Sequence, residues 1–459
     1  MEKVIRQLRE DATGEVLEPG GPGFEDALRL YTRSVRGRPR AVLRARTVED
    51  VALAVRATGQ AGVALSMRGG GHSGAGFAVA DRGLMLDLSA MRSVRVDPGR
   101  ATASSGPGAT WGDYDAATQR HGLASTGGVV STTGVAGLTL GGGIGALRGL
   151  RGLAVDQLVA ADVVLADGST VTADAGHHPD LFWALRGGGG NFGVVVRFEF
   201  ALHPVARLVT GLLGWPLGSA NRVVREFTGF AGALPDHIVG ELIFTGAVGE
   251  PSLLMTPRVV GTAGDAEPLL APMRATGPST DTVAERSYVD GQRFLDPLAE
   301  WGMRHYWHTC TLGHLDDEVV ALLARFTEGS PSPTNLITVE HLHGRMSRID
   351  PDSTPVGFRH APYNVFIEAK WADPADDEAN RRWARELIDA LRPHAAGGAY
   401  VNYLPYDATT ADIASAYGPR RFDRLRAIKA RYDPANLFRT NQNIPPGWSV
   451  SRGSMPSER

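Results

Sequence analysis

Residues 62–76 read GVALSMRGGGHSGAG, an apolar run that ends in a loop of glycines. The loop brings together an arginine, three glycines, a histidine and a serine: Arg68, Gly69, Gly70, Gly71, His72 and Ser73. A strand that ends in such a loop presents backbone N–H groups on a concave surface that suits a pyrophosphate. The histidine would then lie where the loop meets the ring of a cofactor. The alternative interpretation is a glycine-rich turn that carries a histidine by chance.

A second glycine-rich stretch covers residues 125–158, STGGVVSTTGVAGLTLGGGIGALRGLRGLAVDQL. Its glycines would let the backbone approach a flat or charged ligand closely. A purely structural loop of this length would cost much conformational entropy without an evident gain in packing. The pattern therefore favours a ligand-binding segment.

Residues 181–200, LFWALRGGGGNFGVVVRFEF, contain the glycine spacing of a dinucleotide fingerprint at Gly188, Gly190 and Gly193. That fingerprint follows a strand and opens a helix, with an acidic residue about 20 positions further on. Here a predicted helix precedes the glycines and a predicted strand follows them, so a nicotinamide site is disfavoured.

Two further stretches near the C-terminus, AYVNY at 399–403 and YDPANLFRTNQNI at 432–444, are rich in tyrosine and asparagine. Singly, such residues usually serve core packing and turns. In this order, the four groups of motifs resemble the berberine bridge enzyme-like FAD-linked oxidases, and in particular bacterial secondary-metabolism members. These oxidases are a branch of the vanillyl alcohol oxidase superfamily with a PCMH-type FAD-binding domain. The resemblance spans about residues 40–445.

The resemblance implies an α+β fold in which a PCMH-type, two-subdomain FAD-binding domain carries an inserted substrate domain, built on an antiparallel sheet backed by helices. On the sequence, we expect an N-terminal FAD-binding part at residues 1–206, a substrate-binding domain at 207–399, and a C-terminal segment, 400–459, that returns to the FAD-binding part. The final dozen residues are expected to form a frayed tail.

The cofactor implied by the resemblance is FAD, with a single covalent bond to His72. Relatives commonly add a second bond through a cysteine, but Val130 occupies the matching position here. The expected FAD contacts are Arg68, Gly69, Gly70, Gly71, His72, Ser73, Gly128, Thr132, Thr133, Gly134, Gly137, Leu138, Gly142, Gly143, Gly193, Val195, Asn402, Tyr403, Asn441 and Asn443.

The resemblance implies that catalytic polar side chains lie on the predicted strand 363–371, YNVFIEAKW. Alternate residues of a strand share one face, which here holds Asn364, Phe366, Glu368 and Lys370. Glu368 is the first candidate for the base that removes a proton during oxidation. Lys370 on the same face allows the alternative of an ordinary solvated face. Glu340 in ITVEHLH is the second candidate, whereas His341 and His343 are expected to be surface residues.

Tyr400 is the third candidate, because many relatives use a tyrosine of this C-terminal motif together with a tyrosine in a GGGYG version of the second glycine segment. This chain carries Ile144 at the latter position. The departure leaves room for a carboxylate base, or for a flavin that oxygenates its substrate. Thr133 matches the family position that governs access of oxygen to the flavin edge.

The leading hypothesis is an oxidase that passes a hydride from an alcohol, phenolic, polyketide or alkaloid-like metabolite to FAD, with O₂ as acceptor and H₂O₂ as product. The alternatives are a carbohydrate oxidase, an oxygenating or cyclising flavoenzyme, and a resistance protein that sequesters a drug on a flavin scaffold.

Composition limits the partners, the location and the metal sites that we expect. A net charge of −3 over 459 residues without long basic runs disfavours nucleic acid as a partner. No apolar run suits a signal peptide or membrane span, so the expected location is cytoplasmic, as a monomer or homodimer without a membrane partner. Cys310 is the single cysteine and is expected to be buried, and no HExxH spacing is present, so no metal site is expected.

Overall fold

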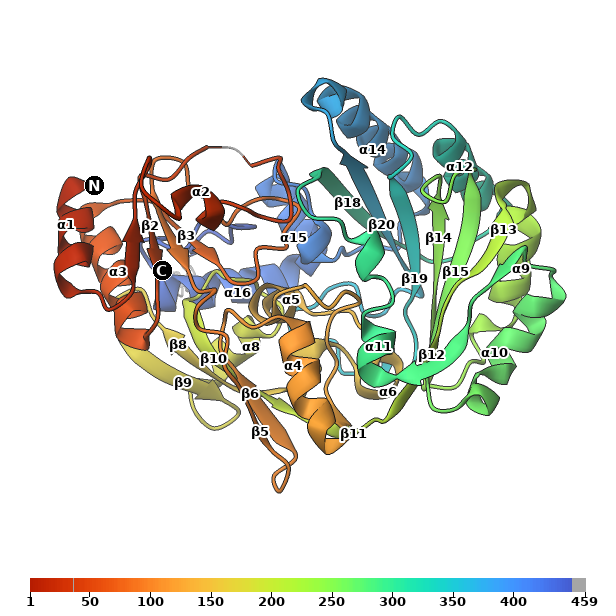
Figure 1. Ribbon diagram of the computed structural model, residues 1–459, viewed down its shortest axis with the longest axis horizontal. Helices are drawn as coiled ribbons and strands as arrows, with labels where there is room; N and C mark the ends of the chain where they lie inside the picture. The colour runs from red at the N-terminus through yellow and green to blue at the C-terminus, as the bar shows by residue number, and fades with distance from the viewer. Residues whose placement is uncertain (36, 448–459) are drawn as a thin grey trace, which may run out of the picture.

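A computed structural model describes residues 1–35 and 37–447 of the chain. Three sheets of four or more strands organise these residues, two within residues 1–206 and a larger one within 207–371 (Figure 1), and β7 (Leu123–Ala124) and β11 (His203–Pro204) form a separate two-stranded sheet. The expected frayed tail, residues 448–459, lies outside the described residues.

The first sheet has the strand order β1-β2-β4-β3. Strands β2 and β3 run parallel to β4, whereas β1 is antiparallel to β2. The helices α1 and α3 share a hydrophobic core with this sheet. The bounds are α1 (Glu2–Asp11), β1 (Glu15–Leu17), α2 (Phe24–Ala27), β2 (Ala41–Arg44), α3 (Val48–Ala61), β3 (Leu65–Arg68) and β4 (Leu84–Asp87). A threonine at 47 with Asp50 three residues on predicts a helix N-cap, and the side chain of Thr47 indeed accepts a hydrogen bond from the backbone N–H of Asp50 at the start of α3.

Residues 23–35, GFEDALRLYTRSV, predict a helix on their sequence, but this prediction is mostly wrong, because α2 ends at Ala27. Beyond it, other segments provide the backbone acceptors. The N–H of Tyr31 donates to the carbonyl of Gly71 at 2.9 Å, and the N–H of Arg33 donates to that of Met303 at 2.7 Å. Tertiary pairing thus outcompetes local helix formation and brings Tyr31 against the His72 loop.

The second sheet is antiparallel, in the order β5-β6-β10-β8-β9. Asp167 and Gly168, a pair that predicts a hairpin turn, lie between β8 and its antiparallel partner β9. The core of this sheet also takes side chains from α4, α8 and the C-terminal helices α15 and α16. The bounds are β5 (Val94–Asp97), β6 (Thr102–Ser105), α4 (Trp111–Thr118), β7 (Leu123–Ala124), β8 (Leu158–Val164), β9 (Thr170–Asp174), α8 (Pro179–Leu185), β10 (Val194–Ala201), β11 (His203–Pro204), α15 (Thr410–Tyr417) and α16 (Pro419–Tyr432).

The glycine spacing between residues 127 and 152, within the second glycine-rich stretch, predicts a long loop. In the structure, short helices interrupt it. Their bounds are α5 (Val135–Gly141) and α6 (Arg148–Arg151), and α7 (Ala154–Gln157) follows directly. Turns rich in glycine separate them, and these turns, rather than the helices, carry the glycines with positive φ, such as Gly142 and Gly143.

The third sheet is antiparallel throughout, in the order β16-β13-β15-β14-β19-β20-β18, with β12 pairing both β15 and β17. The strands are β12 (Arg207–Thr210), β13 (Leu213–Pro216), β14 (Ile238–Thr245), β15 (Ser252–Val260), β16 (Thr280–Asp281), β17 (Ala284–Ser287), β18 (Arg304–Leu312), β19 (Leu336–His341) and β20 (Tyr363–Trp371). The helices are α9 (Ala220–Ala231), α10 (Ala263–Ala275), α11 (Tyr288–Gln292), α12 (Asp317–Glu328), α13 (Arg345–Arg348) and α14 (Asp377–Leu391).

The two faces of this third sheet have different neighbours. One set of alternating residues, including Leu242, Val339 and Ile367, packs with α9, α10, α12 and α14 in a large apolar core. That core includes Cys310, which is buried as predicted. The other face is turned toward the glycine-rich segments. The expected α+β class, with an antiparallel sheet backed by helices, is confirmed.

None of the helices in residues 1–35 and 37–447 is long and apolar enough to span a bilayer.

Candidate active site

A cavity of about 380 Å³ lies between the free face of the third sheet and the glycine-rich segments, within the range of roughly 300–1,000 Å³ typical of small-molecule sites. All three candidate catalytic residues line it: Glu340, Glu368 and Tyr400. So do most of the expected FAD contacts: Arg68, Gly69, Gly70, Gly71, His72, Ser73, Thr133, Gly134, Gly137, Leu138, Gly193, Val195, Asn402, Tyr403 and Asn441.

The remaining expected FAD contacts do not line this cavity: Gly128, Thr132, Gly142, Gly143 and Asn443. Two of them contact residues that do: the Oγ1 atom of Thr132 lies near Nε2 of His72, and the backbone N–H of Gly143 donates to the hydroxyl of Tyr400. The carbonyl of Gly128 accepts from the side-chain amide of Gln292, which does not line the cavity. Thr132 and Gly143 therefore lie behind the cavity wall.

Two glycine-rich segments cross at Gly70 and Gly134. A Cβ atom added to Gly70 would lie 2.5 Å from the Cα of Gly134, a separation that real side chains do not show. The close crossing exposes a side-chain-free stretch of backbone to the cavity. Next to it, Nε of Arg68 is buried and has no hydrogen-bond partner among the described residues. A backbone cradle with a guanidinium at its edge suits a pyrophosphate.

His72 is held between Thr132 and Tyr31. The Oγ1 atom of Thr132 lies 3.2 Å from Nε2 of His72, and the ring of Tyr31 stacks on the imidazole with a centroid separation of 4.0 Å. Burial lowers the pKa of His72 to about 4. The imidazole is therefore neutral at physiological pH, as a nucleophilic ring nitrogen must be.

Glu340 and Glu241 are cross-strand neighbours on β19 and β14. Arg148 and Arg258 pair with Glu241 at 3.0 and 3.4 Å. Burial raises the pKa of Glu241, but the charges of the two arginines outweigh this effect and lower it overall. Glu241 is thus a buried anion.

Glu340 accepts hydrogen bonds from the side-chain amide of Asn364 at 2.6 Å and from the hydroxyl of Tyr403 at 3.2 Å. Burial, reinforced by the negative charge of Glu241, raises the pKa of Glu340 to about 7. Two neighbouring carboxylates with pKa values pushed apart are typical of acid–base sites.

Glu368 lies on the same face of β20 as Asn364 and Phe366, as the sequence predicts. Its Oε1 atom accepts a hydrogen bond from the hydroxyl of Tyr31 at 3.2 Å and lies 3.3 Å from Nδ1 of His305. The alternative of a solvated face is wrong, because Glu368 and Lys370 are both buried, and the ammonium of Lys370 donates to the carbonyl of Leu298 at 2.7 Å.

The resemblance implies that Tyr400, Asn402 and Tyr403 lie on a strand. In the structure they lie in and beside a single turn of 3-10 helix, η6 (Val401–Tyr403). The hydroxyl of Tyr400 accepts hydrogen bonds from the backbone N–H of Gly143 at 3.0 Å and from the amide of Asn402 at 2.9 Å. Burial raises the pKa of Tyr400 to about 12. Tyr400 therefore connects the second glycine segment to the C-terminal segment.

The C-terminal asparagine segment closes over the third glycine motif. The side-chain amide of Asn441 donates to the carbonyl of Gly190 at 3.0 Å, and that of Asn191 donates to the carbonyl of Gln442 at 3.1 Å. The Oδ1 atom of Asn441 is buried without a partner among the described residues, at the cavity wall. An acceptor in this position fits a ligand that donates a hydrogen bond.

The expectation that His341 and His343 are surface residues is wrong for His341, which is buried. The two rings stack with a centroid separation of 4.3 Å, and burial lowers the pKa of His341 to about 3. His341 is the last residue of β19 and does not line the cavity as its neighbour Glu340 does, which agrees with the alternation of side chains along a strand.

Tyr31 and Glu241 are two of the cavity residues that sequence reasoning missed. Tyr31 lies in a segment predicted as helix, and its contact with His72 depends on tertiary pairing. Residues 240–248, GELIFTGAV, predict a strand on which Glu241 and Ile243 share a face, but the neighbour of Glu241 across the sheet depends on a strand register that the sequence does not reveal.

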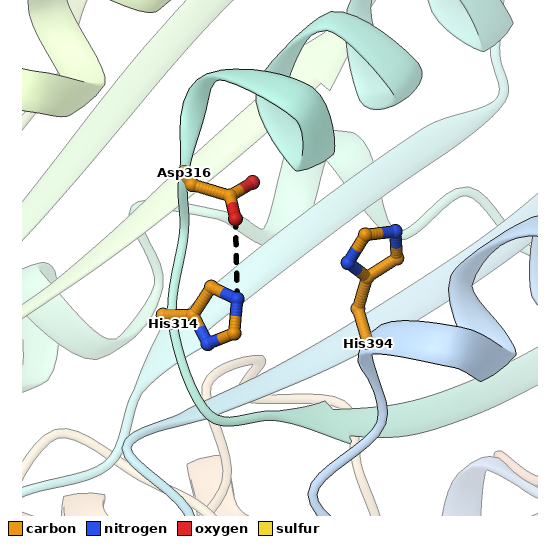
Figure 2. Close-up of side chains that lie close together, drawn as sticks. All are labelled: His314, Asp316 and His394. Carbon is orange, nitrogen blue, oxygen red and sulfur yellow. Dashed lines mark ion pairs between the residues drawn. The ribbon is translucent and has the colours of Figure 1, made fainter.

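His314, Asp316 and His394 are the described residues that come closest to a metal-binding group, with one donor atom each and all three atoms within 4.8 Å of one another. Figure 2 shows Asp316 paired with His314, at 3.1 Å, and His394 facing them from another segment. None of the three lines the cavity. That this protein has no metal site stays a prediction.

The backbone cradle, the neutral histidine and the orphaned polar atoms together fit a flavin dinucleotide, which defines the class of protein as a flavin-dependent oxidoreductase. Comparison with known proteins agrees. Residues 39–174 match the FAD binding domain family, and residues 399–445 match the family described as berberine and berberine like.

Relatives match over nearly the whole chain. (R)-6-hydroxynicotine oxidase from Paenarthrobacter nicotinovorans is 31% identical over 94% of this chain and 97% of its own length. The crystal structure of 6-hydroxy-D-nicotine oxidase from Arthrobacter nicotinovorans superposes with a TM-score of 0.87 at 29% identity, over 95% of this chain and 99% of that one. Glucooligosaccharide oxidase from Acremonium strictum, whose FAD is described as 6-S-cysteinyl and 8α-N1-histidyl, gives a TM-score of 0.86 at 25% identity, over 97% and 99%.

The chain belongs to the berberine bridge enzyme-like family of FAD-linked oxidases, with their PCMH-type fold, as the sequence motifs predicted.

Proposed function

We propose that this protein oxidises a small apolar metabolite by moving a proton to Glu340 and a hydride to FAD, which O₂ then reoxidises with release of H₂O₂. The observation that carries the proposal is Glu340, a buried carboxyl at the cavity wall with a pKa of about 7. A base of this pKa is half ionised near neutral pH, where general base catalysis is most effective.

When bound, FAD would supply the hydride acceptor. The chain's own part is to remove the proton from a substrate hydroxyl or amine. The hydroxyl of Tyr403 and the amide of Asn364 both donate to Glu340, so they orient the carboxylate and stabilise its ionised form. Glu340 takes this role in preference to Glu368, because its pKa of about 7 suits a general base near neutral pH, whereas the contact with His305 and the charge of Lys370 outweigh burial and lower the pKa of Glu368.

We propose a single covalent bond between FAD and His72. The neutral imidazole at the cavity wall and the histidyl link of the glucooligosaccharide oxidase support it. Val130 lines the cavity in the region where a cysteine would be needed for a second bond, so we propose none. Mass spectrometry of acid-precipitated protein tests this, since colour left in the supernatant and a bare polypeptide mass would contradict it.

The substrate side of the cavity favours an aromatic, polyketide or alkaloid-like compound over a carbohydrate. The third sheet and the segment before β18 contribute apolar side chains that include Ile243, Leu295, Leu298, Ala299, Leu336 and Phe366, beside the polar Glu241, Thr338, Glu340 and Glu368. A sugar would leave hydroxyls unpaired against the apolar part of this wall. The carbohydrate oxidase remains the second candidate, because one relative is named a xylooligosaccharide oxidase.

We propose that the FAD-binding parts are residues 1–206 and 400–459 and the substrate domain 207–399, since the second sheet shares its core with α15 and α16. A cytoplasmic location and a monomeric or dimeric state stay predictions.

The deciding experiment follows peroxide release and oxygen uptake under air with panels of aromatic alcohols, aromatic amines and oligosaccharides. We expect turnover with a member of the aromatic panels. Turnover confined to oligosaccharides would favour the carbohydrate oxidase. Binding without oxygen consumption by any panel would favour the sequestering protein, and incorporation of oxygen into the product would favour the oxygenating enzyme.

A further inference from the structure

We propose that Glu368, assisted by Tyr31 and His305, accepts the proton that must leave the flavin's 8α-methyl group when His72 becomes covalently attached to it. The inference rests on the covalent link proposed above. It gives the chain a second proton-transfer site, which acts once in the life of each molecule and is separate from the one that oxidises substrate.

Three rings form a continuous stack beside Glu368. The ring of Tyr31 lies between the two imidazoles, 4.0 Å from His72 with an interplanar angle of 14° and 4.4 Å from His305 with an angle of 23°. Oε1 of Glu368 contacts both the Tyr31 hydroxyl and the imidazole of His305. A chain of contacts thus joins the proposed attachment residue to a buried carboxyl.

Charge singles out Glu368 as the proton acceptor of this cluster. Burial raises its pKa, but the contact with His305 and the charge of Lys370 outweigh burial, so the pKa is lower than usual and the group is ionised. Burial lowers the pKa of both His72 and His305, and it raises that of Tyr31 well above its ordinary value. At neutral pH the cluster therefore consists of one carboxylate and three uncharged rings.

Glu368 also lies too far along the sheet from Glu340 to remove the same substrate proton. In the register of β19 and β20, Glu340 pairs with Asn364 and Glu368 pairs with Leu336. Four residues of strand separate the two positions, which amounts to about 13 Å at roughly 3.3 Å per residue. One carboxyl is thus close to the attachment residue, and the other is close to Tyr403.

The attachment balances with O₂ as the oxidant. One C–H bond of the 8α-methyl group breaks and its proton passes to Glu368. A ring nitrogen of His72 loses its N–H proton and forms the new C–N bond. The electron pair released passes through the flavin ring to O₂, which takes up the two protons as H₂O₂.

The test compares covalent flavin in Glu368→Gln, Tyr31→Phe and wild-type protein. Each is purified under the same conditions and incubated with FAD under air, and the covalent fraction is followed by intact mass and by flavin fluorescence after denaturing electrophoresis. We expect Glu368→Gln to bind FAD but to attach it at least about a hundredfold more slowly. Tyr31→Phe, which removes one hydroxyl, should slow attachment less.

Controls separate this inference from the proposed function. Glu340→Gln, the matched loss of the other cavity carboxyl, should attach FAD at the wild-type rate, whereas His72→Ala should attach none. Formate added to Glu368→Ala should restore part of the attachment rate if the lost group is a base.

Attachment at the wild-type rate in Glu368→Gln would overturn the inference and leave the covalent link intact. A wild-type protein without covalent flavin would overturn both. If Glu368→Gln fails to bind FAD, the Tyr31→Phe rate decides, and a wild-type rate there overturns the inference.

Discussion

Glu241 and Glu340 face each other across the β14–β19 pair, and two guanidinium groups hold the first carboxylate ionised while the second lies at the cavity wall. The strand register thus places a permanent negative charge beside the proposed base. Because like charges disfavour ionising together, this arrangement and burial explain why the pKa of Glu340 is raised to about 7.

Replacing Glu340 with Gln should slow flavin reduction by about 10²–10⁴-fold, because the amide keeps the shape of the side chain but cannot accept the substrate proton. The measurement is anaerobic stopped-flow reduction with the best substrate of the peroxide screen. Glu226→Gln, which changes an exposed glutamate on α9, is the matched control and should reduce at the wild-type rate. If Glu340→Gln reduces its flavin at nearly the wild-type rate, the base that removes the substrate proton would be Glu368 or Tyr400.

The rate of flavin reduction should depend on pH through Glu340. With a pKa of about 7, the carboxyl is protonated and inactive below that pH. The rate should therefore rise about tenfold per pH unit at acidic pH and level off above roughly pH 8. Stopped-flow measurements from pH 5 to pH 9 check this, with Glu340→Gln expected to lack the acidic limb. A flat wild-type profile would contradict the assignment.

Glu241→Gln should move that acidic limb to lower pH. The variant removes the negative charge next to Glu340 and leaves Arg148 and Arg258 without their carboxylate, so the ionised form of Glu340 becomes more favourable. The same loss should destabilise the protein by about 3–5 kcal/mol, because two buried cations lose their partner. Thermal unfolding measures the second effect. If the folded variant keeps the acidic part of its pH–rate profile at the wild-type pH, Glu241 does not raise the pKa of Glu340.

Local sequence features predicted much of this site. Strand 363–371 was predicted with the bounds of β20, because its apolar and polar residues alternate, and that alternation placed Glu368 on a shared face with Asn364. The glycine loop around His72 could also be predicted, because the residues that mark it follow one another directly in the sequence.

Contacts between distant segments were not predictable in this way. Tyr31 reaches His72 only because its backbone pairs with Gly71, and Glu241 meets Glu340 only through the register of two strands far apart in the chain. The burial of His341 was missed for a related reason, since its cover comes from Phe227 of α9, which the sequence places more than a hundred residues earlier.

Tyr400→Phe distinguishes a structural role for this hydroxyl from a catalytic one. The Tyr400 oxygen accepts from Gly143 and Asn402, and its pKa of about 12 disfavours proton removal at neutral pH. We expect a loss of about 1–3 kcal/mol in stability from the unpaired donors, and a fall of less than about tenfold in the reduction rate. A hundredfold fall in a variant with normal FAD content would instead make Tyr400 the base.

Gly70→Ala tests the backbone crossing that forms the cradle. The added methyl group would lie 2.5 Å from the Cα of Gly134, so one of the two segments must move. We expect a stability loss of about 1–3 kcal/mol and a lower ratio of flavin to protein absorbance in the purified material. Gly59→Ala is the matched control, because its Cβ on α3 would meet only ordinary contacts at 3.6 Å and beyond. That variant should keep its flavin and gain about 0.5–1 kcal/mol. If Gly70→Ala retains full flavin and stability while Gly59→Ala behaves as expected, the two segments cannot form the cradle as described.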